Sequence, residues 1–282
     1  MLDALLLLGG DFVYYSLTIA NNNEYADGIL NTYDTWHLFP SERPSFKPPK
    51  FKMSTIDIPG RNGLLDVSTS LTKVPTYGNR TGSFEFIIDP ESPYTWSDTY
   101  SKVANCIHGQ EKLVSLEDDS AYWYEGRLWV NDFLSDKKWS SITINYSMVP
   151  YKKSKWTTID EWQVDPFDLD VPISTFFKDL VVDSDDWTDI LNTRTMMERR
   201  YRQEMVGQGA VVPTVIVNSN DGNGLDISSH NLELDKLYTG HLPDGRNKVN
   251  DIIFSMFNPD NIIRFSAKGH GTVSIEYNVR SL

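Results

Sequence analysis

Apolar and polar residues alternate along much of the first half of the chain, which is the period of strands that are buried on one face. The clearest run places Ile142, Ile144, Tyr146 and Met148 on one face, with small polar residues between them. Further alternating runs occupy residues 13–19, 84–88 and 112–116. Together with the Gly- and Pro-rich turns between them, these runs predict about seven or eight strands in a sandwich or barrel.

One of these strands is apolar on both faces. In residues 122–131, Tyr122 and Tyr124 fall on one face, whereas Trp123 and Trp129 fall on the other. A strand of this kind has to be covered on both sides, so we expect a second sheet or another subunit to pack against it.

Two helices are predicted. The first has Ser97 as its cap, an apolar stripe of Tyr100, Val103 and Ile107, and Gly109 as its stop. The second covers about residues 185–205, where acidic residues at the start and arginines toward the end match the helix macrodipole. Its apolar stripe comprises Trp187, Ile190, Leu191, Met197 and Tyr201.

The chain becomes β-rich again from residue 211. The Asp221-Gly222 pair is a strong hairpin turn signal, and residues 272–279 alternate strictly. We therefore predict a mainly β protein with an N-terminal sandwich or barrel-like domain, carrying one packed helix, and a C-terminal jelly-roll sandwich with an added helix. The predicted boundaries are 1–155 for the first domain, 156–210 for a connector that is pinned by Trp162 and Phe167, and 211–282 for the second domain, which can include part of the connector.

Composition and charge narrow the function. The net charge is −13, with −4 in residues 1–155 and −9 in the rest, and no long basic stripe suggests contact with nucleic acid. The acidic second half disfavours anionic membranes. Leu5 to Leu8 form too short a run for a signal peptide, and no segment reaches the ~20 apolar residues of a membrane span, so we expect a soluble cytoplasmic product.

Candidate chemistry is sparse. Cys106 is the only cysteine, which excludes an intrachain disulfide, and the five histidines lack the spacing of a metal site on a helix. No Gly-x-Ser-x-Gly elbow, phosphate loop or dinucleotide fingerprint occurs.

Three acidic clusters can each be interpreted either as a functional site or as an ordinary structural feature. Residues 117–119 fit a solvated turn better than a carboxylate pair or a cation site, and residues 183–186 fit a helix start better than a calcium loop. Residues 218–226 are the best calcium candidate, although a Gly-Asn-Asp turn has the same composition. We accordingly expect no catalytic site, no metal and no cofactor.

A series of motifs in a fixed order carries a family resemblance. They read TWHLFPSERP at residues 35–44, IDIPGRNGLLD at 56–66, YGNR at 77–80 and YEGR at 124–127. Over about residues 12–155 this series resembles the N-terminal domain of the distal tail proteins of siphophages. Residues 162–167 and 269–275 resemble the second domain of that family more loosely, whereas residues 1–11 and the helix at about 185–205 depart from it.

The resemblance implies a structural virion protein and not an enzyme. In that family the first domain forms a hexameric ring at the distal end of the tail tube, and the second is a galectin-like jelly roll. The implied partners are further copies of the chain, the tail tube protein, the hub at the tail tip or baseplate and, as a further candidate, a receptor-binding protein for host attachment. We place the ring interface at Pro59, Gly60, Arg61, Asn62, Tyr77, Asn79, Arg80, Trp123 and Trp129.

An alternative function is binding of host cell-wall sugar by the C-terminal sandwich. Such a site needs exposed aromatic residues beside polar ones, and Trp187, Tyr238 and His241 are the candidates. A tail-associated hydrolase is a weaker alternative, because no acid and base pair has a supporting context.

Overall fold

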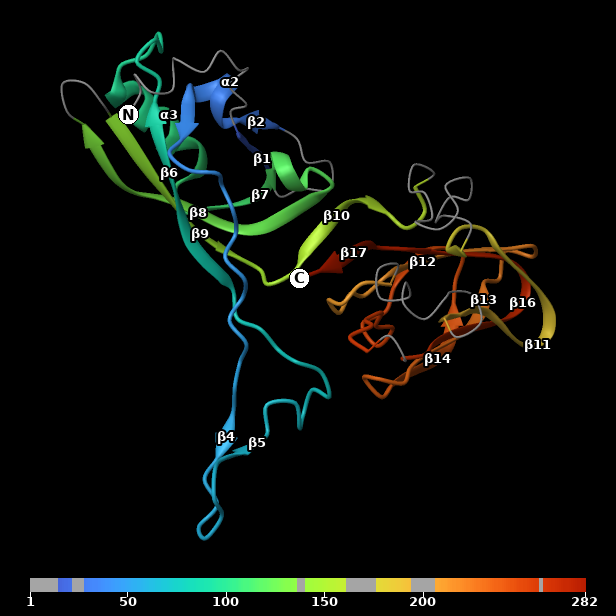
Figure 1. Ribbon diagram of the computed structural model, residues 1–282. Coiled ribbons are helices and arrows are strands. Elements are labelled where there is room, and N and C mark those ends of the chain that lie inside the picture. The colour runs from blue at the N-terminus through green and yellow to red at the C-terminus, as the bar shows by residue number, and fades with distance from the viewer. Residues whose placement is uncertain (1–14, 22–27, 136–139, 161–175, 194–205, 259–260) are drawn as a thin grey trace. The chain divides into compact units, whose positions relative to one another are not determined.

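The computed structural model describes residues 15–21, 28–135, 140–160, 176–193, 206–258 and 261–282 (Figure 1). The predicted N-terminal extension at 1–11 and the connector motif at 162–167 lie outside these residues. The chain divides into two compact units, each described by itself below. The first comprises Met1–Pro48 and Asn79–Val149, and the second comprises Pro49–Gly78 and Pro150–Leu282.

The first unit is built on an antiparallel sheet in the order β2-β1-β7-β8-β9-β6-β3. Its strands are β1 (Leu17–Asn21), β2 (Leu30–Asn31), β3 (Leu38–Pro40), β6 (Arg80–Ile88), β7 (Gln110–Leu116), β8 (Tyr122–Ser135) and β9 (Ser140–Met148). The alternation predicted for residues 142–148 is confirmed, because every second side chain of β9 is buried.

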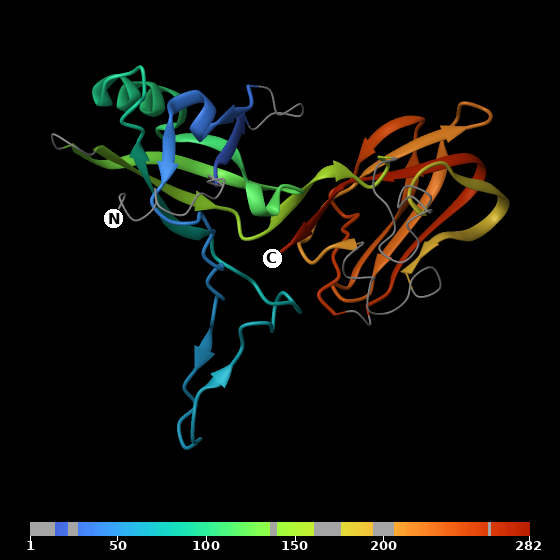
Figure 2. The same cartoon turned by 45° about the horizontal axis from the view of Figure 1, so that its top comes forward.

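Two helices cover one face of this sheet (Figures 1 and 2). The longer helix, α3 (Trp96–Ile107), begins after Thr95, whose hydroxyl oxygen accepts the backbone N–H of Asp98. The observed cap thus lies two residues before the predicted cap, Ser97, while Val103 and Ile107 are buried as the stripe requires. The single-turn helix α2 (Thr32–Trp36) was not predicted; its Trp36 joins the same core.

Strand β8 uses both of its faces, as its sequence indicates. Tyr124 packs into the main core of the unit, whereas Trp123 is buried on the other face with Ala20 and Leu113. Between β7 and β8, residues 117–119 form the short 3-10 turn η1 (Glu117–Asp119), so the predicted turn is confirmed.

The second unit centres on the long strand β16 (Ile263–Glu276). The antiparallel order is β14-β13-β16-β12-β15, with β11 (Leu180–Asn192) along the opposite edge of β16. The remaining strands are β12 (Thr214–Ser219), β13 (Leu225–Asn231), β14 (Lys236–Leu242) and β15 (Gly245–Lys248), together with β10 (Lys152–Thr157), which pairs with β17 (Asn278–Ser281).

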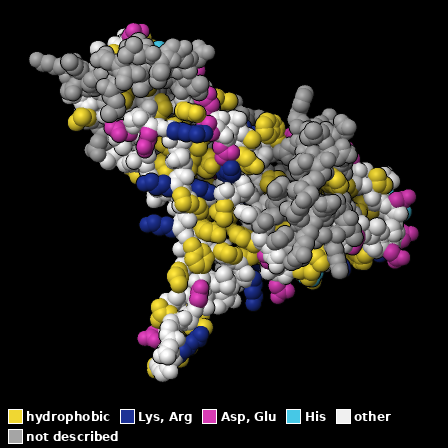
Figure 3. Space-filling model, viewed as in Figure 1, with side chains coloured by type: hydrophobic (Ala, Val, Ile, Leu, Met, Phe, Trp, Pro, Cys, Tyr) yellow, Lys and Arg dark blue, Asp and Glu magenta, His cyan; other side chains and the backbone are white. Residues whose placement is uncertain are grey.

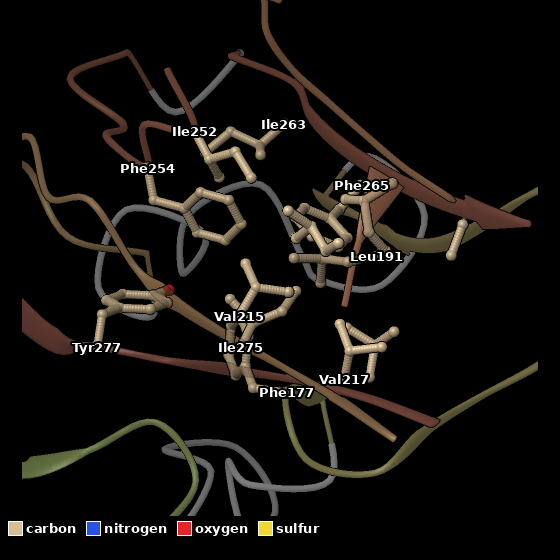
Figure 4. Close-up of a cluster of buried hydrophobic side chains, with 14 of the residues drawn as sticks. Phe177, Leu191, Val215, Val217, Ile252, Phe254, Ile263, Phe265, Ile275 and Tyr277 are labelled. Atoms are coloured by element: carbon tan, nitrogen blue, oxygen red, sulfur yellow. The ribbon is translucent and has the colours of Figure 1, made fainter. Parts of the chain in front are cut away.

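A hydrophobic core lies inside this bent sheet (Figure 4). Phe254 packs edge-on against Phe265 and Tyr277, with ring centroids 6.2 and 5.4 Å apart. The strands contribute one face each, for example Val215 and Ile275, which are fully buried. The core therefore forms because successive segments of one sheet curl toward each other.

Two sequence predictions for this unit were wrong. Residues 185–192 of the predicted helix belong to β11, which pairs with β16 over almost its whole length; residues 194–205 lie outside the described part. Register shifts at residues 184–188 and 189–191 interrupt the alternation of β11, so its apolar residues take a spacing that imitates a helix. The Asp221-Gly222 turn exists, but β12 and β13 do not pair as a hairpin, because both lie along the same edge of β16.

Candidate interaction surface

Residues 49–78 run outward and back as two neighbouring segments, which together we call the arm. The two segments are joined by the short antiparallel strands β4 (Thr55–Ile56) and β5 (Leu65–Asp66). Nearer its base, Phe51 and Tyr77 form an isolated β-bridge, and the ring of Tyr77 contacts that of Tyr151 with centroids 6.2 Å apart. Burial raises the pKa of Tyr151 to about 12, so the hydroxyl group of Tyr151 stays uncharged at physiological pH.

The arm exposes an unusual amount of apolar surface (Figure 3). Leu71 is 97% exposed, Met53 69% and Leu64 60%. Phe51, Ile56 and Ile58 are also exposed. A two-stranded hairpin is only marginally stable by itself in water, and exposed apolar side chains in this number make the arm a candidate interaction surface.

The tip of the arm carries four of the predicted interface residues. Pro59, Gly60, Arg61 and Asn62 are all exposed, and the N–H of Arg61 donates to the carbonyl of Ile58 across the turn. Gly60 has φ +83°, and a Cβ placed there would meet no atom within 4 Å. Glycine is thus required by the backbone conformation, not by crowding, and the space around the tip is open.

The remaining predicted interface residues are not gathered at one place. Asn79 donates to the hydroxyl of Ser147 at 3.1 Å, and Trp129 is half-buried opposite Asn145. Arg80 and Trp123 are 6% and 8% exposed. Because their side chains are buried, Arg80 and Trp123 would support an interface from beneath and would not contact the partner themselves.

Arg80 stabilises the segment that precedes the arm through contacts at Lys47. Its guanidinium donates to the carbonyl of Lys47 and lies over the ring of Tyr124, while the N–H of Lys47 donates to the hydroxyl of Tyr146. Burial lowers the pKa of Arg80, although an arginine remains protonated at any physiological pH. The exposed Arg43 pairs with Asp118 at 2.6 Å and fixes the same segment to η1.

The acidic clusters are engaged in hydrogen bonds within the chain. Asp119 accepts from the hydroxyl of Tyr124, Asp221 holds Asn223, and Asp226 pairs with His241. Asp183, predicted to start a helix, instead lies on β11 and pairs with His270. Within the described residues, no group of three or more His, Cys, Asp and Glu side chains is placed to hold a metal ion.

A cavity of about 70 Å³ in the first unit is lined by Arg43, Lys47, Phe84 and Tyr146, among others. Ligand pockets typically measure about 300–1,000 Å³, so this space suits a few water molecules. It does not suggest a substrate site.

Two of the three residues considered for sugar binding, Tyr238 and His241, lie on opposite faces of β14. His241 pairs with Asp226 on the outer face of the second unit, and Trp187 on β11 is 48% exposed. Tyr238 lies opposite the buried Ser229 and packs against the core. The structure therefore does not assemble the aromatic platform proposed from the sequence.

Sequence reasoning named the tip of the arm as a candidate interface but missed the apolar residues on either side of it. Met53, Leu64 and Leu71 lie among turn residues and show no strand or helix period, so the pattern gave no reason to call them buried or exposed. Their signal was their apolar character within a Pro- and Gly-rich segment.

These features define a mainly β chain of two units with an exposed, apolar arm. No helix in the described part of the chain is long and apolar enough to cross a membrane. No protein-family model and no curated protein sequence matches the chain.

Among solved structures the chain is similar to SPP1 Dit (gp 19.1), described as a paradigm of the hub adsorption apparatus in phages that infect Gram-positive bacteria. The similarity has a TM-score of 0.52 at 11% sequence identity and covers 94% of this chain and 99% of that protein. The fold of this chain is thus that of a siphophage distal tail protein, as the motifs predicted.

Proposed function

We propose that this chain is a structural protein of a phage tail tip, which forms a hexameric ring at the distal end of the tail tube and joins the tube to the hub and the host-recognition apparatus. The observation that carries the proposal is the likeness to SPP1 Dit along nearly the whole of both chains. A likeness of that extent includes both β units and the arm, not a single common domain. In this role the chain works by assembly and not by catalysis.

The arm supplies the contact between neighbouring copies in this proposal. A heterologous contact repeated around a closed axis generates a ring, and it needs a surface on each copy that reaches the next. Met53, Leu64 and Leu71 provide apolar area whose burial would stabilise such a contact, at about 25 cal/mol per Å².

Charge favours another copy of this chain as the occupant of the arm. Residues 49–78 hold four basic residues, Lys50, Lys52, Arg61 and Lys73, and two acidic ones, Asp57 and Asp66. The whole chain holds 26 basic and 39 acidic residues, so the rest of it has 22 and 37. A basic, apolar arm is therefore complementary to the acidic remainder of a second copy, which orients the encounter and disfavours arm-to-arm pairing.

Electron microscopy of purified tails tests the assignment. Six copies around the tail axis, between the tube and the hub, are the expected result. A single copy, or a place in the capsid, would overturn it. Labelling the chain with a small C-terminal tag and locating the tag on the tail gives an independent position.

A further inference from the structure

The sheet of the second unit has a corner where its backbone ladder is interrupted. Strand β12 stops pairing with β16 at Ser219 opposite Gly271, and β13 resumes at Asp226 opposite Lys268. Residues 220–224 form the loop between them, here called the corner loop. On the other edge of β16, the register of β11 shifts between residues 184 and 188. Side-chain hydrogen bonds therefore add connections where the regular backbone pairs are missing.

His241 fastens the corner loop to β13. Its Nδ1 lies 2.9 Å from a carboxylate oxygen of Asp226, and its Nε2 lies 2.8 Å from the carbonyl oxygen of Asn223. Both partner atoms can only accept hydrogen bonds. A neutral imidazole has a single N–H, so both bonds exist together only when His241 is protonated.

His270 makes the matching connection on the other edge. Its Nδ1 lies 2.6 Å from Asp183 and its Nε2 lies 3.4 Å from Asp185, both on β11. Its backbone carbonyl accepts the N–H of Asn220 in the corner loop at 2.9 Å. Protonated His270 thus ties β11 to β16 beside the register shift, whereas its backbone carbonyl anchors the corner loop whatever the charge of the ring.

The charges around both histidines favour the protonated form. His241 faces Asp226 on β13 and Asp221 in the corner loop, and Lys268 on β16 lies opposite Asp226 in the backbone register of the two strands. His270 faces Asp183 and Asp185 on β11. The hydrogen bonds to Asp226 and Asp183 raise the pKa of His241 and of His270 above the ordinary value of 6.5. The remaining carboxylate nearby, Asp244, accepts from the N–H and the hydroxyl of Ser219 at the end of β12.

We propose that His241 and His270 form a proton-operated clasp, in which protonated His241 holds the corner loop to β13 and protonated His270 holds β11 to β16, and which loosens when the rings lose their protons. Deprotonation leaves one ring nitrogen of each histidine facing an acceptor, so one connection on each side is lost. Both side chains are about half exposed, so they exchange protons with solvent without unfolding. The device belongs to the second unit alone and does not depend on the proposed place in the tail.

The test is hydrogen exchange of the full chain across pH 5.5 to 9, corrected for intrinsic exchange, with the histidine pKa values measured by NMR on the same sample. We expect the corner-loop amides to be protected at low pH and to lose protection several-fold as the histidines deprotonate, with the same midpoint. Core amides of the first unit, such as that of Ile144 on β9, should keep their protection throughout.

Two variants separate the clasp from general stability. In His241→Gln the pH dependence of the corner loop should shrink, and in His270→Gln that of β11 beside the register shift, because glutamine has no charge to lose in this range. The matched control is His230→Gln. His230 lies on β13 of the same unit but outside the clasp, so this variant should retain the full pH response. If either glutamine variant fails to fold, Asp226→Asn and Asp183→Asn keep the acceptor and should shift the midpoint to lower pH.

Loop protection that is independent of pH in the wild type would overturn the proposal. So would a pH response that survives in both glutamine variants, or histidine pKa values at or below 6.5. A response that appears equally in core amides of the first unit would point to unfolding of the whole chain and would also reject the clasp.

Discussion

Removing apolar side chains from the arm should prevent assembly without harming the fold. Leu64 and Leu71 are 60% and 97% exposed, so Leu64→Ser and Leu71→Ser together should change the stability of the isolated chain by no more than about 0.5 kcal/mol. If a second copy covers both residues, the exposed parts of two leucines leave water at each contact. Full burial of one leucine is worth roughly 1.5–3 kcal/mol, so the loss per contact is about 2 to 4 kcal/mol.

A loss of that size weakens each contact by roughly 30- to 700-fold. Sedimentation of the purified protein together with the count of copies on assembled tails measures the effect, while the melting temperature monitors the fold. The matched control is Leu237→Ser, which removes a leucine that is 64% exposed on β14, away from the arm. If the double variant assembles like the wild type, or if the control disrupts assembly equally, the arm is not the contact and the reasoning fails.

Three further outcomes are expected. The folded-state pKa values of His241 and His270 are raised, so the stability that the two protonated histidines add is present below about pH 6.5 and is lost as the pH rises through those pKa values. The melting temperature of the second unit should therefore fall over that pH range. A melting temperature that rises instead would contradict the direction of these pKa shifts. Gly126→Ala should destabilise the first unit by about 1–3 kcal/mol in denaturant unfolding, because the new Cβ would clash with the carbonyl oxygen of Ser147 on the neighbouring strand. An unchanged unfolding midpoint would show that β8 and β9 can separate at Gly126 and Ser147. Chelator treatment should leave the melting temperature unchanged, and a loss of several degrees would reveal a bound ion, with Asp221 and Asp226 the first residues to test.

Local patterns in the sequence determined much of the architecture. The period-2 run of β9 and the stripe of Val103 and Ile107 in α3 appear in the structure as predicted, because each depends only on which face of one element is buried. The turn at residues 117–119 follows in the same way from its composition. The mainly β class and the likeness to distal tail proteins were also readable from the chain, since short motifs in a fixed order need no knowledge of contacts.

Tertiary structure alone decided the features that depend on partners distant in the sequence. Residues 185–192 became a strand because β16 offered an edge to pair with, and the two register shifts hid that outcome from any search for regular alternation. The arm groups with the second unit through Tyr77 and Tyr151, which are 74 positions apart. His270 lies 87 positions from Asp183, and only the bend of β16 brings β11, β13 and the corner loop close enough for two histidines to connect them. Local propensity acts over a few residues, whereas these arrangements follow from pairing and packing across the whole unit.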